Sequence, residues 1–168
     1  EGVPTADAAW YVRPRGSGLE LERTVLDADG VVLAATAEPV RLGDLLYVRL
    51  ELVNRSGGRL DNVALVDRVP AGWEIENPRL GRGRAPGWVN EDSLWEPDYL
   101  EVRDDRVEVF GGLDAGEART FVYAVRAVTA GRFAVPAPSA EAMYDPRVRA
   151  DGDASEAIVL GPGGGTTK

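Results

Sequence analysis

The most regular feature of this chain is alternation of apolar and polar residues with a period of two. It is clearest over residues 44–54, DLLYVRLELVN, where one face carries Leu46, Val48, Leu50 and Leu52. The alternation recurs over residues 119–128, RTFVYAVRAV, where one side carries Phe121, Tyr123, Val125 and Ala127. A period of two is typical of a β-strand with one buried face. Both segments are therefore predicted to be strands.

Further strand-like segments lie between turn residues. They are residues 18–27, 31–40, 62–75, 99–110 and 155–161. Asp29-Gly30 is a hairpin turn signal, and Pro70-Ala71-Gly72 fits a type I turn. We find no amphipathic helix pattern of 12 or more residues. Short alternating segments separated by turns indicate an all-β chain folded as an antiparallel β-sandwich of immunoglobulin-like type.

Composition along the chain predicts three parts. Residues 1–17 are rich in Pro, Gly and Ala and form a lead-in segment, residues 18–160 form the sandwich domain, and the glycine-rich residues 161–168 form a disordered tail. Within the domain, residues 78–99 contain many Gly and Pro and no periodicity. This segment is predicted to be a long surface loop, of a length that is often functional.

The charge and the missing residue types limit the function. The net charge of −9 argues against binding to nucleic acid or to an anionic membrane surface. The chain has no His and no Cys, which excludes the usual zinc sites, a thiol nucleophile and an imidazole base. We therefore expect no cofactor and no enzymatic activity, but a domain that binds or packs. The first residues do not look like a signal peptide, so the chain could be processed or cut from a longer protein.

Three motifs have a chemical and a simpler interpretation. LDADG, residues 26–30, resembles part of a calcium loop, but its glycine comes two positions early, which favours a hairpin turn. Asp104 and Asp105 could act as general acid and base, but neighbouring strand residues point to opposite faces, and the flanking arginines favour local ion pairs. The tryptophans of the loop region, Trp73, Trp88 and Trp95, could line a sugar or peptide groove, although partial burial is the more frequent outcome.

The segment 121–146 ends in the only methionine of the chain, followed by a tyrosine. Because Pro136, Pro138 and Pro146 cannot donate ladder hydrogen bonds, this stretch is predicted to be an edge or a loop. Asp145 precedes a proline, which stiffens the turn. Met143 and Tyr144 could pack into the domain's own core or face a partner. The residues alone leave both interpretations open.

A family resemblance favours the second interpretation. The chain resembles the last domain of the bacterial alpha-2-macroglobulins, large protease-trapping proteins. The matching segments, in the family's order, are VALVDRVPAGWEIENPRL (63–80), EVRDDRVEVF (101–110) and FVYAVRAVTAGRFAVPAPSAEAMYDP (121–146), with EGVP and GLELERTVLDADG at the start. The likeness covers most of residues 1–160 and implies a macroglobulin-type β-sandwich.

The resemblance also implies a function. In that family, a neighbouring domain holds a thioester that captures a protease, and the last domain shields this bond until the bait is cleaved. Met143 and Tyr144 match the pair on the family's shielding loop; Met143 would act as an apolar plug, and Tyr144 would anchor the loop. Pro146 belongs to the same turn, and we expect Glu141 and Arg126 to fix the loop or contact the partner domain. The expected partners are the thioester domain, other macroglobulin domains of the parent chain and the captured proteases.

Two other functions stay open at this stage. One is a free-standing surface β-sandwich of the adhesin-repeat type that binds through its tryptophan loop. An isopeptide staple is disfavoured there, because the only lysine is Lys168. The other is a hydrolase that uses Asp104 and Asp105. The resemblance places the parent in the periplasm, with an inner-membrane lipoprotein anchor as an open option.

Overall fold

The fold was taken from a computed structural model, which describes residues 15–33, 39–77 and 86–162, without the side chains of Arg15 and Asn77. Regular structure in these ranges is β-strand, apart from the short 3₁₀ turn η1 (Glu91–Ser93). No helix in the described ranges is long and apolar enough to cross a membrane. The all-β, antiparallel fold predicted from the alternation is therefore confirmed.

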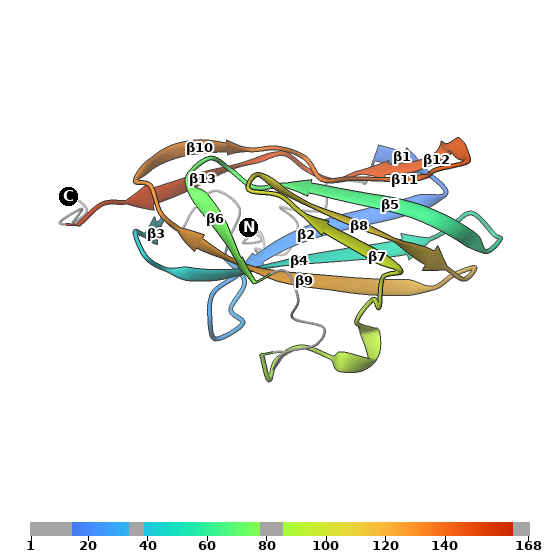
Figure 1. Ribbon diagram of the computed structural model, residues 1–168, viewed down its shortest axis with the longest axis horizontal. Coiled ribbons are helices and arrows are strands. Elements are labelled where there is room, and N and C mark those ends of the chain that lie inside the picture. Colours follow the sequence, from blue (N-terminus) through green and yellow to red (C-terminus); the bar gives the residue numbers. More distant parts are fainter. Residues whose placement is uncertain (1–14, 34–38, 78–85, 163–168) are drawn as a thin grey trace, which may run out of the picture.

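The strands form two layers, shown in Figure 1. The first layer contains a six-stranded sheet in the order β1 (Arg15–Ser17), β12 (Asp145–Asp151), β11 (Ser139–Ala142), β5 (Leu60–Arg68), β8 (Arg106–Leu113) and β7 (Tyr99–Val102). The second layer is a four-stranded sheet in the order β2 (Leu19–Leu26), β4 (Leu45–Asn54), β9 (Ala118–Ala127) and β6 (Trp73–Asn77). A smaller sheet of β10 (Gly131–Val135), β13 (Ser155–Leu160) and β3 (Val40–Arg41) extends the first layer.

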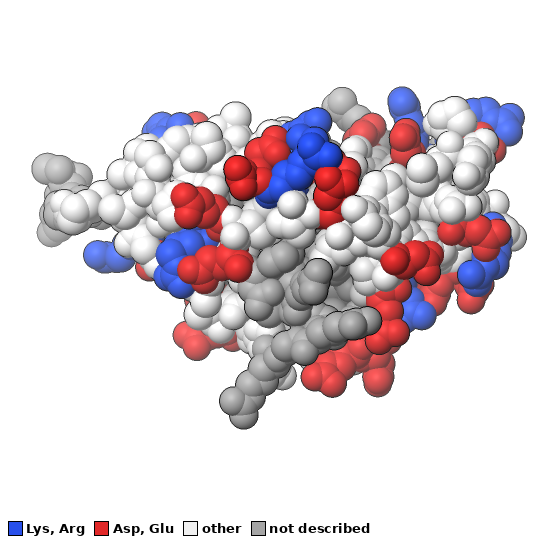
Figure 2. All heavy atoms as spheres, viewed as in Figure 1, with Lys and Arg blue, Asp and Glu red and all other residues white. Residues whose placement is uncertain are grey.

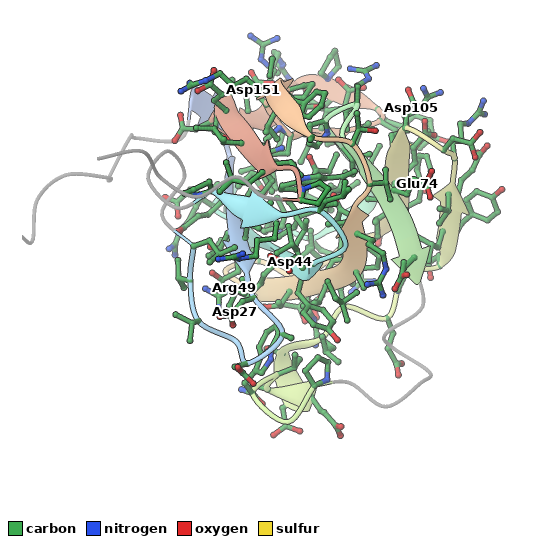
Figure 3. All side chains as sticks on the ribbon, turned by 90° about the vertical axis from the view of Figure 1, so that its left-hand side faces the viewer. Asp27, Asp44, Arg49, Glu74, Asp105 and Asp151 are labelled. Atoms are coloured by element: carbon green, nitrogen blue, oxygen red, sulfur yellow. The ribbon has the colours of Figure 1, made fainter. Side chains whose placement is uncertain are left out.

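The core lies between the two layers, and side chains fill this space in the view along the long axis (Figure 3). On β4 the predicted inward face is fully buried, with Leu46, Val48, Leu50 and Leu52 at 0–1% exposure. β9 is buried on both faces, because Trp88, Val89 and Leu94 cover Val122 and Ala124 from outside. The part of the loop that the structure describes, from Pro86 onward, therefore packs as a lid on the outer face of the second sheet.

Three predictions about element boundaries are wrong. Residues 15–17 belong to the sheet as β1, whereas a lead-in segment was predicted for them. In the segment 31–40, the described pairing is one bridge, Leu26 with Val32, and the short β3, instead of a continuous strand. β11 lies inside the six-stranded sheet, between β12 and β5, although its flanking prolines predicted an edge or a loop. The rest of the lead-in, residues 78–85 of the predicted loop and tail residues 163–168 lie outside the described residues.

The turn after β2 is fitted closely to the loop lid. Gly30 has a φ of +83°, and a Cβ built on it would lie 2.5 Å from Cγ of Trp88. Trp88 in turn packs edge-on against Tyr47, with ring centroids 5.5 Å apart. The glycine is needed here twice, for its backbone conformation and for the close approach of the indole.

This fit gives a prediction with a matched control. Gly57 has the same φ of +83° but no atom within 4 Å of its built Cβ. Gly57→Ala is expected to cost about 1–2 kcal/mol of unfolding free energy, the strain of a left-handed alanine. Gly30→Ala is expected to cost about 1–3 kcal/mol more, because it also overpacks Trp88. Urea denaturation measures both, and equal losses would contradict the packing described here.

Candidate functional site

The strongest candidate site is the turn between β11 and β12, called the tip from here on (residues 143–146). Ala142 pairs with Asp145 across the hairpin, so Met143 and Tyr144 form a two-residue turn. Met143 is 52% exposed and Tyr144 is 85% exposed, the latter being the largest exposure among the large apolar residues described. Neither side chain is enclosed in the core. The sequence left open whether these side chains pack into the core or face outward, and in the structure they face outward.

The backbone holds the tip in place. The Met143 N–H donates to the Asn62 carbonyl of the neighbouring strand β5 at 2.8 Å. Arg147 donates two hydrogen bonds to the Asp145 carboxylate, at 2.8 and 3.0 Å, and this lowers the pKa of Asp145. Because the next pair after Ala142–Asp145 is Glu141–Arg149, residues 146–148 bulge out of the ladder. Pro146 lies in this bulge, where its missing N–H costs nothing.

Of the other two residues expected at the site, Glu141 lies on the same hairpin and Arg126 lies in the other layer. Glu141 is exposed on β11, directly opposite Arg149 of β12. Arg126 lies on β9, in the second layer, where it donates to Glu76 and to the Gly43 carbonyl. Since these contacts do not involve the tip, Arg126 does not fix the loop in this structure.

Tyr144 was expected to anchor the loop by packing and a hydrogen bond. At 85% exposure its ring packs little against its own domain. Any anchor that it provides must therefore be on a surface outside the described residues. The same holds for Met143, whose exposed thioether offers a soft, polarisable contact surface.

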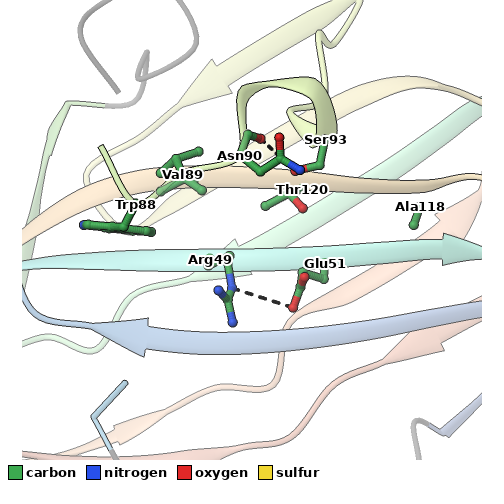
Figure 4. Close-up of a pocket in the computed structure, with 9 residues that line it drawn as sticks. Arg49, Glu51, Trp88, Val89, Asn90, Ser93, Ala118 and Thr120 are labelled. Carbon is green, nitrogen blue, oxygen red and sulfur yellow. Dashed lines mark hydrogen bonds and ion pairs between the residues drawn. The ribbon is translucent and has the colours of Figure 1, made fainter. Parts of the chain in front are cut away.

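The tryptophans do not form a common binding groove. Trp73 and Trp95 are buried in the main core, whereas Trp88, which belongs to the lid, is half-buried. The prediction of partial burial therefore holds for Trp88, and the other two are buried more completely than predicted. Beside Trp88 lies a hollow of about 310 Å³ on the outer face of the second sheet, where Arg49 points toward Glu51 (Figure 4). On the face shown in Figure 2, acidic side chains gather over η1, where Glu91 and Asp92 lie.

The two carboxylate motifs have structural roles. Asp27 accepts the N–H groups of Asp29 and Val31, which closes the predicted hairpin turn. Asp104 and Asp105 are exposed in the β7–β8 turn, and Asp105 lies at the periphery in Figure 3. Arg106 pairs with Asp105 at 3.3 Å. The local ion pairs expected from the flanking arginines are therefore present.

Sequence reasoning missed a buried polar cluster in the core, formed by Arg23, Asp67 and Tyr123. The Arg23 guanidinium donates to the Asp67 carboxylate at 2.8 Å, and the Tyr123 hydroxyl donates to the same carboxylate at 2.8 Å. The side chains of Arg23 and Asp67 are 5% and 1% exposed. A signal was present, because both charged residues stand at inward positions of alternating strands, after Leu21 and Leu65.

Burial sets the ionisation of this cluster. It raises the pKa of Asp67, while the Arg23 guanidinium and the Tyr123 hydroxyl lower it. Burial and the Asp67 carboxylate raise the pKa of Tyr123 well above its usual value, so its hydroxyl stays a donor. The pKa of Asp67 stays raised overall, because its two partners only partly offset the effect of burial.

The sequence matches a family described as "Bacterial Alpha-2-macroglobulin MG10 domain" over residues 18–147. It is 32% identical over 169 residues to the alpha-2-macroglobulin of Escherichia coli K12, which covers 93% of this chain and 10% of that protein. The chain thus spans about a tenth of the length of this relative.

Two solved structures agree with this match. The native alpha-2-macroglobulin of Escherichia coli, from domain MG7 to the C-terminus, has a TM-score of 0.76 and 33% identity, covering 87% of this chain and 24% of that chain. The Salmonella alpha-2-macroglobulin reacted with methylamine has a TM-score of 0.76 and 32% identity, covering 88% of this chain and 10% of that chain.

Proposed function

The chain belongs to the bacterial alpha-2-macroglobulin family, and we propose that it is the C-terminal domain of a protease inhibitor whose tip shields a thioester. In this proposal the domain packs on the thioester domain of the same parent chain. Met143 and Tyr144 cover the reactive bond until a protease cleaves the bait. The observation that carries the proposal is the exposure of these two side chains on a turn that its backbone holds in place.

The chemistry of the tip suits this task. A thioester is slowly hydrolysed in water, so it lasts only in a dry, close-fitting site. Met143 supplies a flexible apolar surface that fills an irregular gap, and Tyr144 adds a rigid apolar ring with a hydroxyl donor. Because the turn is already ordered, docking it costs little conformational entropy.

The trigger is a change in how the domains pack. Cleavage of the bait by a protease shifts the parent from one packed arrangement to another, which withdraws the tip from the thioester. The freed bond then reacts with an amine of the protease. Methylamine is a suitable small-amine probe of the thioester, since the Salmonella relative was solved after reaction with it.

The parent works outside the cytoplasm, in the periplasm, where it meets foreign proteases. An inner-membrane lipoprotein anchor would be carried by another part of the parent. Its partners are the thioester domain, the other macroglobulin domains and the captured proteases. In the proposal Glu141 contacts the thioester domain beside Met143, which its exposure on the hairpin that bears the tip supports.

Photo-crosslinking in the full-length parent tests the contact. Benzoylphenylalanine at position 144 is expected to crosslink to the thioester domain in the native state, and treatment with a protease should abolish the crosslink. The control is the same group at Tyr99, which is 57% exposed on the edge strand β7. Crosslinks from position 144 that map to other domains, or that match those from position 99, would contradict the proposal.

A further inference from the structure

The hairpin that bears the tip is one half of a longer ribbon. β10 runs on into β11 and β12 runs on into β13, so two antiparallel chains extend along the whole first layer (Figure 1). The ribbon is interrupted at residues 136–138 and 152–154, where its halves pass from the smaller sheet to the six-stranded sheet. This interruption is the root of the hairpin.

One side chain from the other layer binds both strands of the ribbon at this root. Arg23 of β2 donates to the Pro136 carbonyl at 2.7 Å and to the Asp153 carbonyl at 3.0 Å. Its third acceptor is the Asp67 carboxylate. Both carbonyls lie where the ladder is broken, so they are open to a side-chain donor.

The orientation of Arg23 is itself fixed. The Asp67 carboxylate holds its guanidinium, and the Tyr123 hydroxyl holds that carboxylate from the opposite oxygen, at 2.8 Å. A guanidinium is planar with its donors in a rigid fork, so its three acceptors, the Asp67 carboxylate and the two carbonyls, are held in fixed positions relative to one another. The position of the root relative to the second sheet is therefore set by Arg23.

We propose that Arg23 is a positioning residue that sets the place of Met143 and Tyr144 by fixing the root of the hairpin. The root and the tip are joined by β11, four residues long and paired on both sides, so a shift at the root is transmitted along the strand. The purpose of this role rests on the proposed shielding function. The geometric part stands without it.

Hydrogen exchange of this chain tests the geometric part. Arg23→Lys keeps the charge beside Asp67, but an ammonium is a single point charge and does not span both carbonyls. Exchange of the Met143 amide and of the β11 amides is expected to speed up roughly tenfold or more relative to β8, the factor for losing a hydrogen bond to a charged group. The control is Gly57→Ala, which strains a turn that does not contact the buried cluster or the root, and should change β8 and β11 alike.

A second variant tests the same role in case Arg23→Lys does not fold. Gly152→Ala would place a Cβ 2.7 Å from Cγ of Pro138, displacing the root while Arg23 stays intact. It is expected to speed exchange at the tip in the same way. Equal changes throughout the chain in both variants, or an unchanged Met143 amide, would overturn the positioning role.

Methylamine incorporation into the full-length parent tests whether this positioning role affects the shielding of the thioester. Arg23→Lys should raise methylamine incorporation although Met143 and Tyr144 are unchanged. Faster exchange at the tip without a change in incorporation would overturn the link from Arg23 to the shield. The proposed function is judged separately, by variants of the tip itself.

Discussion

Asp67→Ala is expected to lower the free energy of unfolding by about 3–5 kcal/mol, because it leaves a buried charge without its partner. Asp67 is 1% exposed, and its removal leaves the Arg23 guanidinium and the Tyr123 hydroxyl in the core without this acceptor. Chemical denaturation of this chain measures the loss. Of the substitutions considered in this core, this one is expected to have the largest effect.

An exposed ion pair provides the matched control. Glu76 pairs with Arg126 through two hydrogen bonds on the surface of the second sheet. Glu76→Ala is expected to cost no more than about 1 kcal/mol, as is usual for solvated pairs. If Asp67→Ala and Glu76→Ala gave similar small losses, the buried cluster would not have the structural role assigned to it.

A double substitution separates the charge from the packing. Arg23→Met with Asp67→Leu removes both charges, and such apolar replacements often restore much of the stability lost in the single variant. The restoration should be incomplete, because the carbonyls of Pro136 and Asp153 lose their donor. A double variant less stable than Asp67→Ala would contradict this explanation.

The sequence predicted the parts of the fold that depend on one strand at a time. The inward face of β4 was read directly from its period of two, because burial repeats with the same period. The two-sided burial of β9 could not be predicted this way, since the lid over Val122 comes from a loop about 30 residues earlier in the chain. That contact depends on tertiary packing, which a local pattern does not contain.

The prolines were a partial guide to the site. They predicted that ladder pairing fails near Pro136 and Pro146, and these residues do lie at a break and in a bulge. They did not predict that β11, between them, pairs on both sides. The four-residue strand β11 pairs with β5 and β12. Its pairing with β5 joins residues far apart in the sequence, so the flanking prolines carried no information about it.

The polar cluster could have been found from the sequence. Arg23 and Asp67 interrupt the apolar faces of two predicted strands, each at an inward position. Charged residues are almost never fully buried unless paired. Two opposite charges at such positions therefore predict a buried ion pair, whereas their bonds to Pro136 and Asp153 needed the structure.

Loss of the tip side chains is expected to have the second large effect, in the full-length parent. Met143→Ala with Tyr144→Ala should speed loss of the thioester roughly tenfold or more, the factor for truncating well-packed interface anchors. The reason is access, since alanines leave a gap through which water and small amines reach the bond. Stability of the domain itself should hardly change, because both side chains are largely exposed in it.

The rate of methylamine incorporation into the unactivated full-length parent tests the central claim most directly. The rate is compared among the wild type, Met143→Ala/Tyr144→Ala and Tyr99→Ala, whose substitution also removes an exposed aromatic ring but far from the turn. The shielding account predicts a rise of roughly tenfold or more for the double variant alone. Equal rates in all three proteins would contradict it.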